Sequence, residues 1–174
     1  MKKYLIALLL LCFAMDSISA KKPIYDIDSV TFGIGKSKKG AKIFRIGLIK
    51  NFEHRWNESS NGYFSGYYEL SSNILDIKGK NYVSIALSPV LAIYIKNKNF
   101  MPYFVLGIGG SLWSSTHIGN KNISTHFQFE DRIGMGIKFK NFNFEIKYIH
   151  YSNAGIKDPN PGIDTFFASI TYKF

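Results

Sequence analysis

The sequence predicts an all-β fold, an eight-stranded antiparallel transmembrane β-barrel, and three observations support this prediction. Apolar residues alternate with polar or small ones in eight segments, which is the pattern of strands that cross a bilayer with one face toward lipid. Aromatic residues make up 16% of the chain, with 15 Phe and 11 Tyr, a high share for a soluble domain. The last segment alternates up to the terminal Phe174, and this ending resembles the signal for outer-membrane assembly.

Residues 1–20 are predicted to be a secretory signal peptide, which leaves residues 21–174 as one barrel domain exported to the outer membrane. Lys2 and Lys3 precede an apolar run, and small residues near Ala20 offer a cleavage site. The run is too short for a membrane-spanning helix. A lipoprotein is excluded because Leu11, just before Cys12, stands where a small residue is expected. The mature chain then has no cysteine, which excludes disulfides and thiolate metal sites.

Four strands are expected in the first half of the chain, at residues 28–35, 43–56, 63–74 and 82–96. The first shows the alternation clearly, with Val30 and Ile34 on one face. A lysine- and glycine-rich loop at 36–42 and a polar turn at 57–62 separate the first three strands. In the fourth strand Pro89 lies on the apolar face, and its missing N–H predicts a bulge there.

The other four strands are expected at residues 100–112, 126–139, 142–153 and 164–174. Lys140-Asn141 fits the two-residue turn of a β-hairpin between the second and third of these. Charged residues recur on the faces opposite the apolar ones, among them Glu130, Arg132, Glu145 and Lys147. A polar interior accommodates these charges, so a barrel fits the pattern better than its alternative, a secreted β-sandwich with an apolar core.

The connections are expected to alternate between short periplasmic turns and long external loops, with both chain termini in the periplasm. Several lysines then belong to the external side: Lys36, Lys38, Lys39, Lys78, Lys80, Lys121 and Lys157. The net charge of +10 favours contact with anionic lipid in an exported protein. Nucleic acid is excluded as a partner because the sequence predicts neither a groove nor a stacking platform for it.

The candidate catalytic residues lie where the seventh strand runs into the following loop. His150 and Ser152 are two positions apart, so their side chains share the apolar face of the strand. Asp164 follows after a short loop, and the three side chains are the parts of a Ser-His-acid nucleophile. If the last two strands pair from Phe142 and Phe174, the serine is opposite the aspartate and the histidine is on the diagonal.

A second acid and the oxyanion donors are also candidates. Pairing across the turn after the sixth strand places Asp131 opposite His150, and a carboxylate on a lipid-facing surface is costly, which points to a function. The oxyanion donors are expected in the Asn153 side chain and in the backbone amides near Ala154 and Gly155. The alternative for all of these residues is structural, as part of an interfacial girdle at the strand ends.

The seventh strand and its loop read His150-Tyr151-Ser152-Asn153-Ala154-Gly155 and then Asn160-Pro161-Gly162-Ile163-Asp164. This motif resembles the signature of the lipid A 3-O-deacylase family (PagL), specifically over residues 142–167. The resemblance implies an eight-stranded outer-membrane barrel whose Ser-His-acid triad hydrolyses the ester-linked 3-hydroxyacyl chain at position 3 of lipid A, without a metal cofactor. Ser152 and His150 match the family's serine and histidine. Asp164 stands where the family usually has glutamate, one methylene longer.

These observations predict an outer-membrane esterase that acts on the lipid A of lipopolysaccharide in the outer leaflet. Its acyl chains are expected to lie along outward apolar residues near the triad, namely Phe104, Leu106, Phe129 and Phe166. Two alternatives stay open, an outer-membrane phospholipase with the same triad and a non-enzymatic structural or adhesive barrel. A homodimer is compatible with the sequence, which does not specify the oligomeric state.

Overall fold

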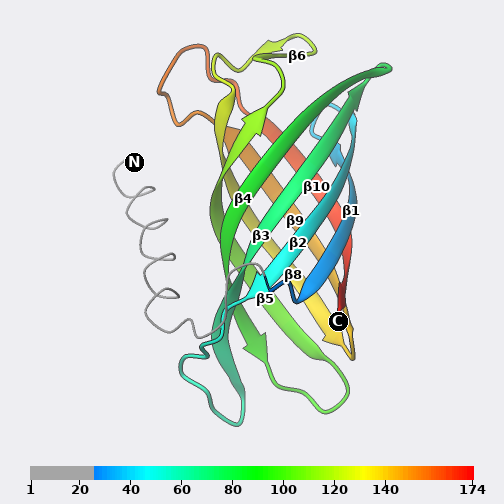
Figure 1. The fold of residues 1–174 in the computed structure, drawn as a ribbon, viewed down its shortest axis with the longest axis vertical. Coiled ribbons are helices and arrows are strands. Elements are labelled where there is room, and N and C mark those ends of the chain that lie inside the picture. The colour runs from blue at the N-terminus through cyan, green and yellow to red at the C-terminus, as the bar shows by residue number, and fades with distance from the viewer. Residues whose placement is uncertain (1–25) are drawn as a thin grey trace.

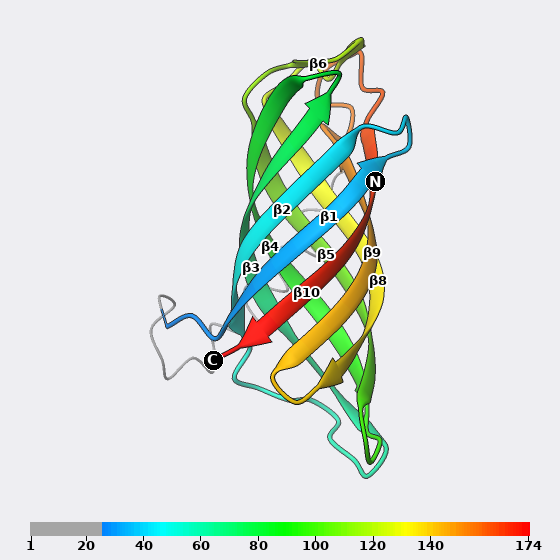
Figure 2. The same cartoon turned by 90° about the vertical axis from the view of Figure 1, so that its right-hand side faces the viewer.

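The computed structural model describes residues 26–174 as a closed barrel of eight long antiparallel strands (Figure 1, Figure 2). These strands are β1 (Ser29–Ser37), β2 (Lys42–Asn51), β3 (Gly62–Ile77), β4 (Lys80–Ile95), β5 (Met101–Trp113), β8 (Phe127–Phe139), β9 (Phe142–Ser152) and β10 (Ile163–Lys173). A two-stranded hairpin, β6 (His117–Ile118) and β7 (Lys121–Asn122), lies in the connection between β5 and β8. The expected signal peptide, residues 1–20, falls outside the described residues.

Each long strand pairs with its neighbour along the chain, and β1 closes the barrel by pairing with β10. Closure leaves no free sheet edge, and it confirms the barrel over the β-sandwich. The start of β1 and the C-terminus lie at one end of the barrel, and the β6–β7 hairpin lies at the other, here called the far end (Figure 1, Figure 2). Among residues 26–174, no helix is long and apolar enough to cross a membrane.

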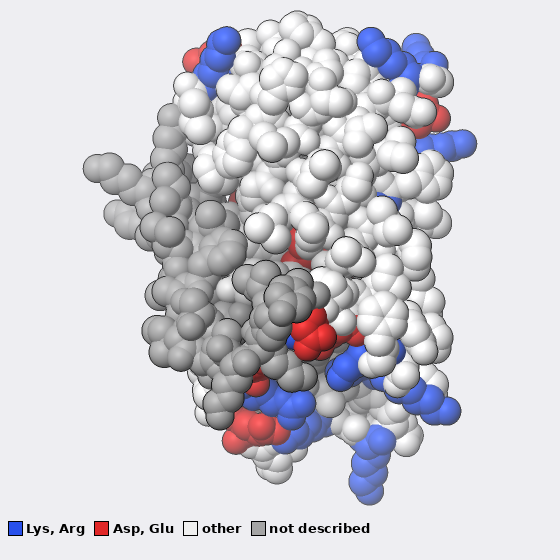
Figure 3. Space-filling view, in the orientation of Figure 1, with Lys and Arg blue, Asp and Glu red and all other residues white. Residues whose placement is uncertain are grey.

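The outer wall of the barrel is apolar, as the alternation predicts. Ile34, Ile85, Leu112 and Ile133 each leave between 58% and 64% of their surface exposed. On the face that Figure 3 shows, charged side chains gather toward the two ends, and the band between them is mostly uncharged. A belt of exposed apolar side chains between two charged rims is the surface that a bilayer requires.

The interior of the barrel holds a network of buried charges, which confirms the prediction of a polar lumen. Arg45 donates hydrogen bonds to Glu69 at 2.7 Å and to Glu130 at 3.0 Å. Arg132 forms ion pairs with the same two carboxylates, and all four side chains are buried. Charges are tolerated in such surroundings only when opposite charges and hydrogen bonds compensate for the lost hydration.

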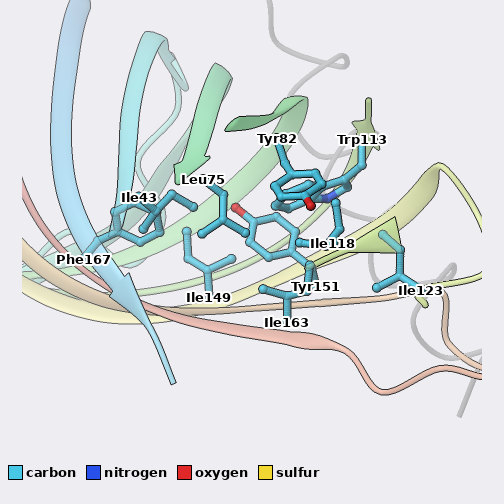
Figure 4. Close-up of a cluster of buried hydrophobic side chains, with 10 residues drawn as sticks. All are labelled: Ile43, Leu75, Tyr82, Trp113, Ile118, Ile123, Ile149, Tyr151, Ile163 and Phe167. Carbon is cyan, nitrogen blue, oxygen red and sulfur yellow. The ribbon is translucent and has the colours of Figure 1, made fainter. Parts of the chain in front are cut away.

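Between this network and the far end, a cluster of apolar side chains fills the lumen (Figure 4). Its members are Ile43, Leu75, Tyr82, Trp113, Ile118, Ile123, Ile149, Tyr151, Ile163 and Phe167. The Tyr151 ring packs edge-on against Trp113 with 5.1 Å between the ring centroids, and its hydroxyl accepts a hydrogen bond from Arg45. Tyr151 therefore joins the apolar cluster to the charge network and anchors the inner side of the β9 end.

The connections differ from the expected alternation of short turns and long loops. At the far end, β3 and β4 are joined by a tight turn at Lys78-Gly79, where both residues have positive φ. At the opposite end, β2 stops at Asn51 instead of residue 56, and residues 52–61 form a longer connection. Loop length therefore does not separate the two ends of this barrel.

Pro89 does not produce the expected bulge. Leu87 pairs with Gly110 and Val90 with Gly107, so the register of β4 against β5 is the same on both sides of the proline. The pairing of β4 with β3 runs through Pro89 without a shift. The missing N–H interrupts one ladder locally and inserts no extra residue.

Candidate active site

The pairing of β9 with β10 brings two of the predicted catalytic residues into contact. His150 lies directly opposite Asp164, and its Nδ1 is 2.7 Å from the Asp164 Oδ1. The expected register was wrong by two residues, because Phe142 pairs with Tyr172 instead of Phe174. A shift by two leaves every side chain on its face, so the grouping on one surface holds while the cross-strand partners change.

The candidate residues point away from the lumen. Ile149 and Tyr151, which alternate with them, are fully buried inside the barrel, so His150 and Ser152 face the outer surface. The His150 side chain is 35% exposed and the Asp164 side chain 21%. Both lie close to the far end, where β9 finishes and β10 begins.

Asp164 is held by a second hydrogen bond, to a residue that the motif did not point to. The Tyr148 hydroxyl donates to the Asp164 Oδ1 at 2.6 Å, and the same oxygen contacts His150. Two donors on one oxygen restrict the rotamer of the carboxylate. The short aspartate reaches the imidazole because the two residues form a direct cross-strand pair. The signal for Tyr148 was its place on the same face, two residues before His150.

The contact with Asp164 also orients the imidazole ring. When Nδ1 carries the proton and donates a hydrogen bond to the carboxylate, Nε2 is the basic nitrogen of the neutral ring. Ser152 lies two residues along on the same face, and within residues 26–174 no hydrogen bond joins its hydroxyl to the ring. Contacts of this kind are often long without substrate and shorten in the reacting complex.

Asp131 occupies the position expected for the second acid, directly opposite His150 on the other side of β9. The expected pairing across the Lys140-Asn141 turn is therefore confirmed. Within the described part of the chain, however, the buried Asp131 Oδ1 has no hydrogen-bond partner. The imidazole forms its hydrogen bond with Asp164, which accepts it.

The loop between β9 and β10 is organised by the Asn153 side chain, which is fully buried. Its amide group donates to the carbonyl oxygens of Ile123 and Lys157, and its Oδ1 accepts a hydrogen bond from the Ile156 N–H. These bonds engage both amide hydrogens. Asn153 therefore holds the loop together, and its donors do not point to the imidazole.

Gly162, near the end of the same loop, packs against the His150 ring. Its φ of 61° lies in the left-handed region, which glycine adopts at little cost. A Cβ atom at this position would lie 2.7 Å from the His150 Cε1 and 3.1 Å from the Tyr151 carbonyl oxygen. The missing side chain lets the loop close over the imidazole, and a Pro-Gly pair such as Pro161-Gly162 is typical of turns.

An apolar groove of about 1000 Å³ runs along the outer wall beside the candidate site. Its lining extends from Phe44 on β2 across β1, β10, β9 and β8 to Phe104 on β5, and it includes Tyr148 and Phe166, which lie on the same outer faces as His150 and Asp164. Leu106 is exposed on the same wall but does not line the groove. Phe129 is largely buried and is the cross-strand partner of Ser152.

Comparisons with known proteins identify the family. A family model described as Lipid A 3-O-deacylase (PagL) matches residues 43–173. The lipid A deacylase PagL of Pseudomonas aeruginosa is 32% identical over 147 residues, which cover 83% of this chain and 84% of the relative. The protein of the same name from Bordetella bronchiseptica is 45% identical over 73 residues, which cover 41% of each chain.

Two solved structures resemble the barrel. The crystal structure of the outer membrane enzyme PagL gives a TM-score of 0.81 at 30% identity and covers 84% of this chain and 99% of the other. Neisserial surface protein A gives a TM-score of 0.51 at 11% identity over 84% of this chain and 94% of the other, a likeness of fold alone. These comparisons do not support the homodimer. By sequence and by fold, the chain belongs to the lipid A 3-O-deacylase (PagL) family of outer-membrane β-barrel enzymes.

Proposed function

We propose that this chain removes the 3-O-linked 3-hydroxyacyl group of lipid A by a Ser-His-Asp mechanism on the lipid-facing wall of its barrel. Ser152 is the nucleophile, His150 is the general base, and Asp164 orients the imidazole. The observation that carries the proposal is the hydrogen bond between His150 and Asp164 on the outer surface, in a chain of this family.

The reaction proceeds through an acyl-enzyme. Ser152 Oγ attacks the carbonyl carbon of the ester while His150 Nε2 takes the hydroxyl proton. The bond to the sugar oxygen then breaks, and the imidazolium returns the proton to that oxygen. A water molecule, deprotonated by His150, attacks the acyl-serine ester. This second step releases the 3-hydroxy fatty acid and restores the serine hydroxyl with the proton from the imidazolium.

Asp164 assists both steps through the imidazole. Its carboxylate keeps the Nδ1 proton in place, so Nε2 is available as the base, and its negative charge stabilises the imidazolium that forms. The hydrogen bond from Tyr148 holds the same carboxylate oxygen in position. Aspartate can replace glutamate in this role because β9 and β10 place it directly opposite the histidine.

The oxyanion of the tetrahedral intermediate requires hydrogen-bond donors near Ser152. Ala154 follows two residues later with a φ of 53°, and within residues 26–174 its backbone N–H donates to no backbone acceptor. We assign this N–H as a donor to the oxyanion. The buried Asn153 supports it indirectly by holding the loop.

The substrate approaches through the membrane. Its acyl chains already lie in the outer leaflet, so the enzyme needs an apolar surface beside the triad and no deep pocket. The groove that includes Phe104 and Phe166 supplies this surface. Acyl chains that lie in the groove would bring the ester to the level of His150, near the far end of the barrel.

Mass spectrometry of lipid A from cells that express the protein tests the activity. We expect the loss of one 3-hydroxyacyl group with the wild type and no loss with Ser152→Ala or His150→Asn. Ser169→Ala, at a buried serine of β10, is the matched control and should keep the activity. Heat-modifiable migration on gels verifies that each barrel has assembled.

The same experiment separates the alternatives. Unchanged lipid A in cells with assembled wild-type barrel would reject deacylation. Release of fatty acids without a 3-hydroxy group would identify a phospholipase. An assembled barrel that leaves every lipid intact would favour a structural or adhesive role.

A further inference from the structure

Three connections meet beside Asp164 at the far end of the barrel. The Lys38 N–H donates to the Asp164 carbonyl oxygen at 2.9 Å, which attaches the β1–β2 turn to the start of β10. The Lys121 Nζ donates to the Gly162 carbonyl oxygen at 2.5 Å, which attaches the β6–β7 hairpin to the β9–β10 loop. One lysine-bearing connection is thus attached to the start of β10, and the other to the loop that closes over the imidazole.

A cavity of about 140 Å³ lies between these connections. Lys38, Lys39, Lys121 and Asp164 contribute to its lining, and Leu75 is among its apolar residues. Since a water molecule takes up roughly 30 Å³ of liquid volume, the cavity has room for a small polar group. Asp164 also contacts the imidazole, so a group bound here lies beside the residue that orients the general base.

Among the described residues, the lysines of this cavity form no ion pair, although the charge of Asp164 acts on Lys121. Within residues 26–174, no carboxylate lies within ion-pair distance of the Nζ atoms of Lys38, Lys39 or Lys121. Burial lowers the pKa of Lys121, the charges of Lys39 and Lys38 add to this effect, and Asp164 opposes it. An anion in the cavity would reduce the repulsion between the ammonium groups of the three lysines. The arginines of the lumen differ from these lysines because each is already neutralised by carboxylates.

We infer that Lys38, Lys39 and Lys121 form a subsite for a phosphate group carried by the sugar head group of the substrate. This inference rests on the proposed function. Each ammonium group offers three hydrogen-bond donors to phosphate oxygens. The acyl chains would then lie in the apolar groove and the phosphate in the cavity, and both sites border the β1–β2 hairpin and the start of β10. The pair of contacts sets the position of the ester.

Steady-state deacylation in neutral detergent micelles tests the subsite. The substrates are lipid A with its phosphates and chemically dephosphorylated lipid A with the same acyl chains. We expect Lys38→Gln/Lys39→Gln/Lys121→Gln to raise the KM for the phosphorylated substrate by about 10-fold or more, with an unchanged KM for the dephosphorylated one. Because Lys121 also holds the Gly162 carbonyl, Lys38→Gln/Lys39→Gln is measured separately and should raise the same KM without lowering kcat.

A matched control removes the same charge elsewhere at the far end. Lys78→Gln/Lys80→Gln/Lys157→Gln changes three lysines that do not line the cavity, and it should leave the KM ratio of the two substrates at the wild-type value. An equal rise of KM in this control would show general attraction to the charged rim and would overturn the subsite. Equal KM values of the wild type for both substrates would also overturn it.

Two further outcomes are distinguishable. Phosphatidylglycerol in the micelles tests whether the phosphate belongs to a neighbouring lipid. If it lowers the wild-type KM for the dephosphorylated substrate, the assignment to the substrate's own phosphate is wrong. If the wild type hydrolyses neither form of lipid A, the proposed function fails and the subsite fails with it. Hydrolysis of both forms with no effect of the lysines rejects the subsite alone.

Discussion

The two faces of β9 carry different tasks within one strand. On the inner face, Lys147 pairs with Glu145 at 3.0 Å, and Tyr151 connects the apolar cluster to Arg45. On the outer face, His150 is partly exposed and contacts Asp164. The inner side chains are held by many partners and the outer ones by few. Substitutions on the inner face of β9, such as at Lys147 or Tyr151, should therefore change the stability of the barrel. Substitutions on the outer face, such as at His150, should change turnover.

The largest effect on turnover after the loss of Ser152 or His150 is expected at Asp164. Asp164→Asn removes the charge that stabilises the imidazolium and can present the wrong tautomer, so kcat should fall by about 10⁴-fold. Asp131→Asn is the matched control, because Asp131 also lies opposite His150 but does not hydrogen-bond to it. Its kcat should fall much less. Equal losses in the two variants would show that the acids share the task.

Gly162→Ala should have the next largest effect. The new methyl group would press on the His150 ring, and displacement of a catalytic group by about 1 Å can lower the rate by about 10²-fold. Gly79→Ala separates this clash from backbone strain, since Gly79 also has a positive φ but no atom within 4 Å of its would-be Cβ. Its kcat should match the wild type. A similar fall in both variants would contradict the role of the close contact.

A smaller effect is expected from Tyr148→Phe. The variant loses one hydrogen bond to the carboxylate of Asp164, and part of its contribution of about 1.5–3 kcal/mol should appear as a reduction of kcat by about 10-fold or less. The KM should stay unchanged. Tyr172→Phe removes a hydroxyl from the same outer wall, far along β10, and should leave both constants unchanged. The ring of Tyr148 lines the groove in both variants, so a rise of KM in Tyr148→Phe would indicate that the hydroxyl itself contacts substrate.

The smallest effect on turnover is expected on the inner face. Glu69→Gln leaves Arg45 and Arg132 with one carboxylate fewer, and breaking a buried ion pair costs about 3–5 kcal/mol of folding stability. The midpoint of urea unfolding in detergent should fall while kcat of the folded protein is retained. Ser152→Ala should show the opposite result, with a retained midpoint and no activity. A large fall of kcat in Glu69→Gln would mean that the two faces are not independent.

The sequence predicted the faces of the strands better than their partners. Alternation placed His150 and Ser152 on the outer wall, because a period of two requires no knowledge of the neighbouring strand. Asp131 was correctly placed opposite His150, since a two-residue turn determines the register of a hairpin. The partner of Asp164 was misplaced by two residues, because the long loop of residues 153–162 imposes no register and the terminal Phe174 extends beyond the paired region.

The alternation of apolar and polar residues did not predict the geometry of the loops. The motif placed Asn153 beside the nucleophile, but only the three-dimensional contacts show that its amide is used by Ile123 and Lys157. The β6–β7 hairpin that brings Lys121 to Gly162 has strands of two residues, too short to give a periodic signal. Contacts between loops that are far apart in the sequence depend on the closed barrel, which brings the loops together. The local sequence of each loop does not predict these contacts.

The filled lumen has a consequence for the membrane in which the barrel lies. Paired charges occupy the middle of the barrel, and the cluster around Tyr151 and Trp113 occupies the far end. Side chains of the described residues therefore occupy the path that a solute would take through the centre of the barrel. Additional copies in the membrane should therefore add enzyme without adding pores, which uptake of a small hydrophilic dye by the cells would check.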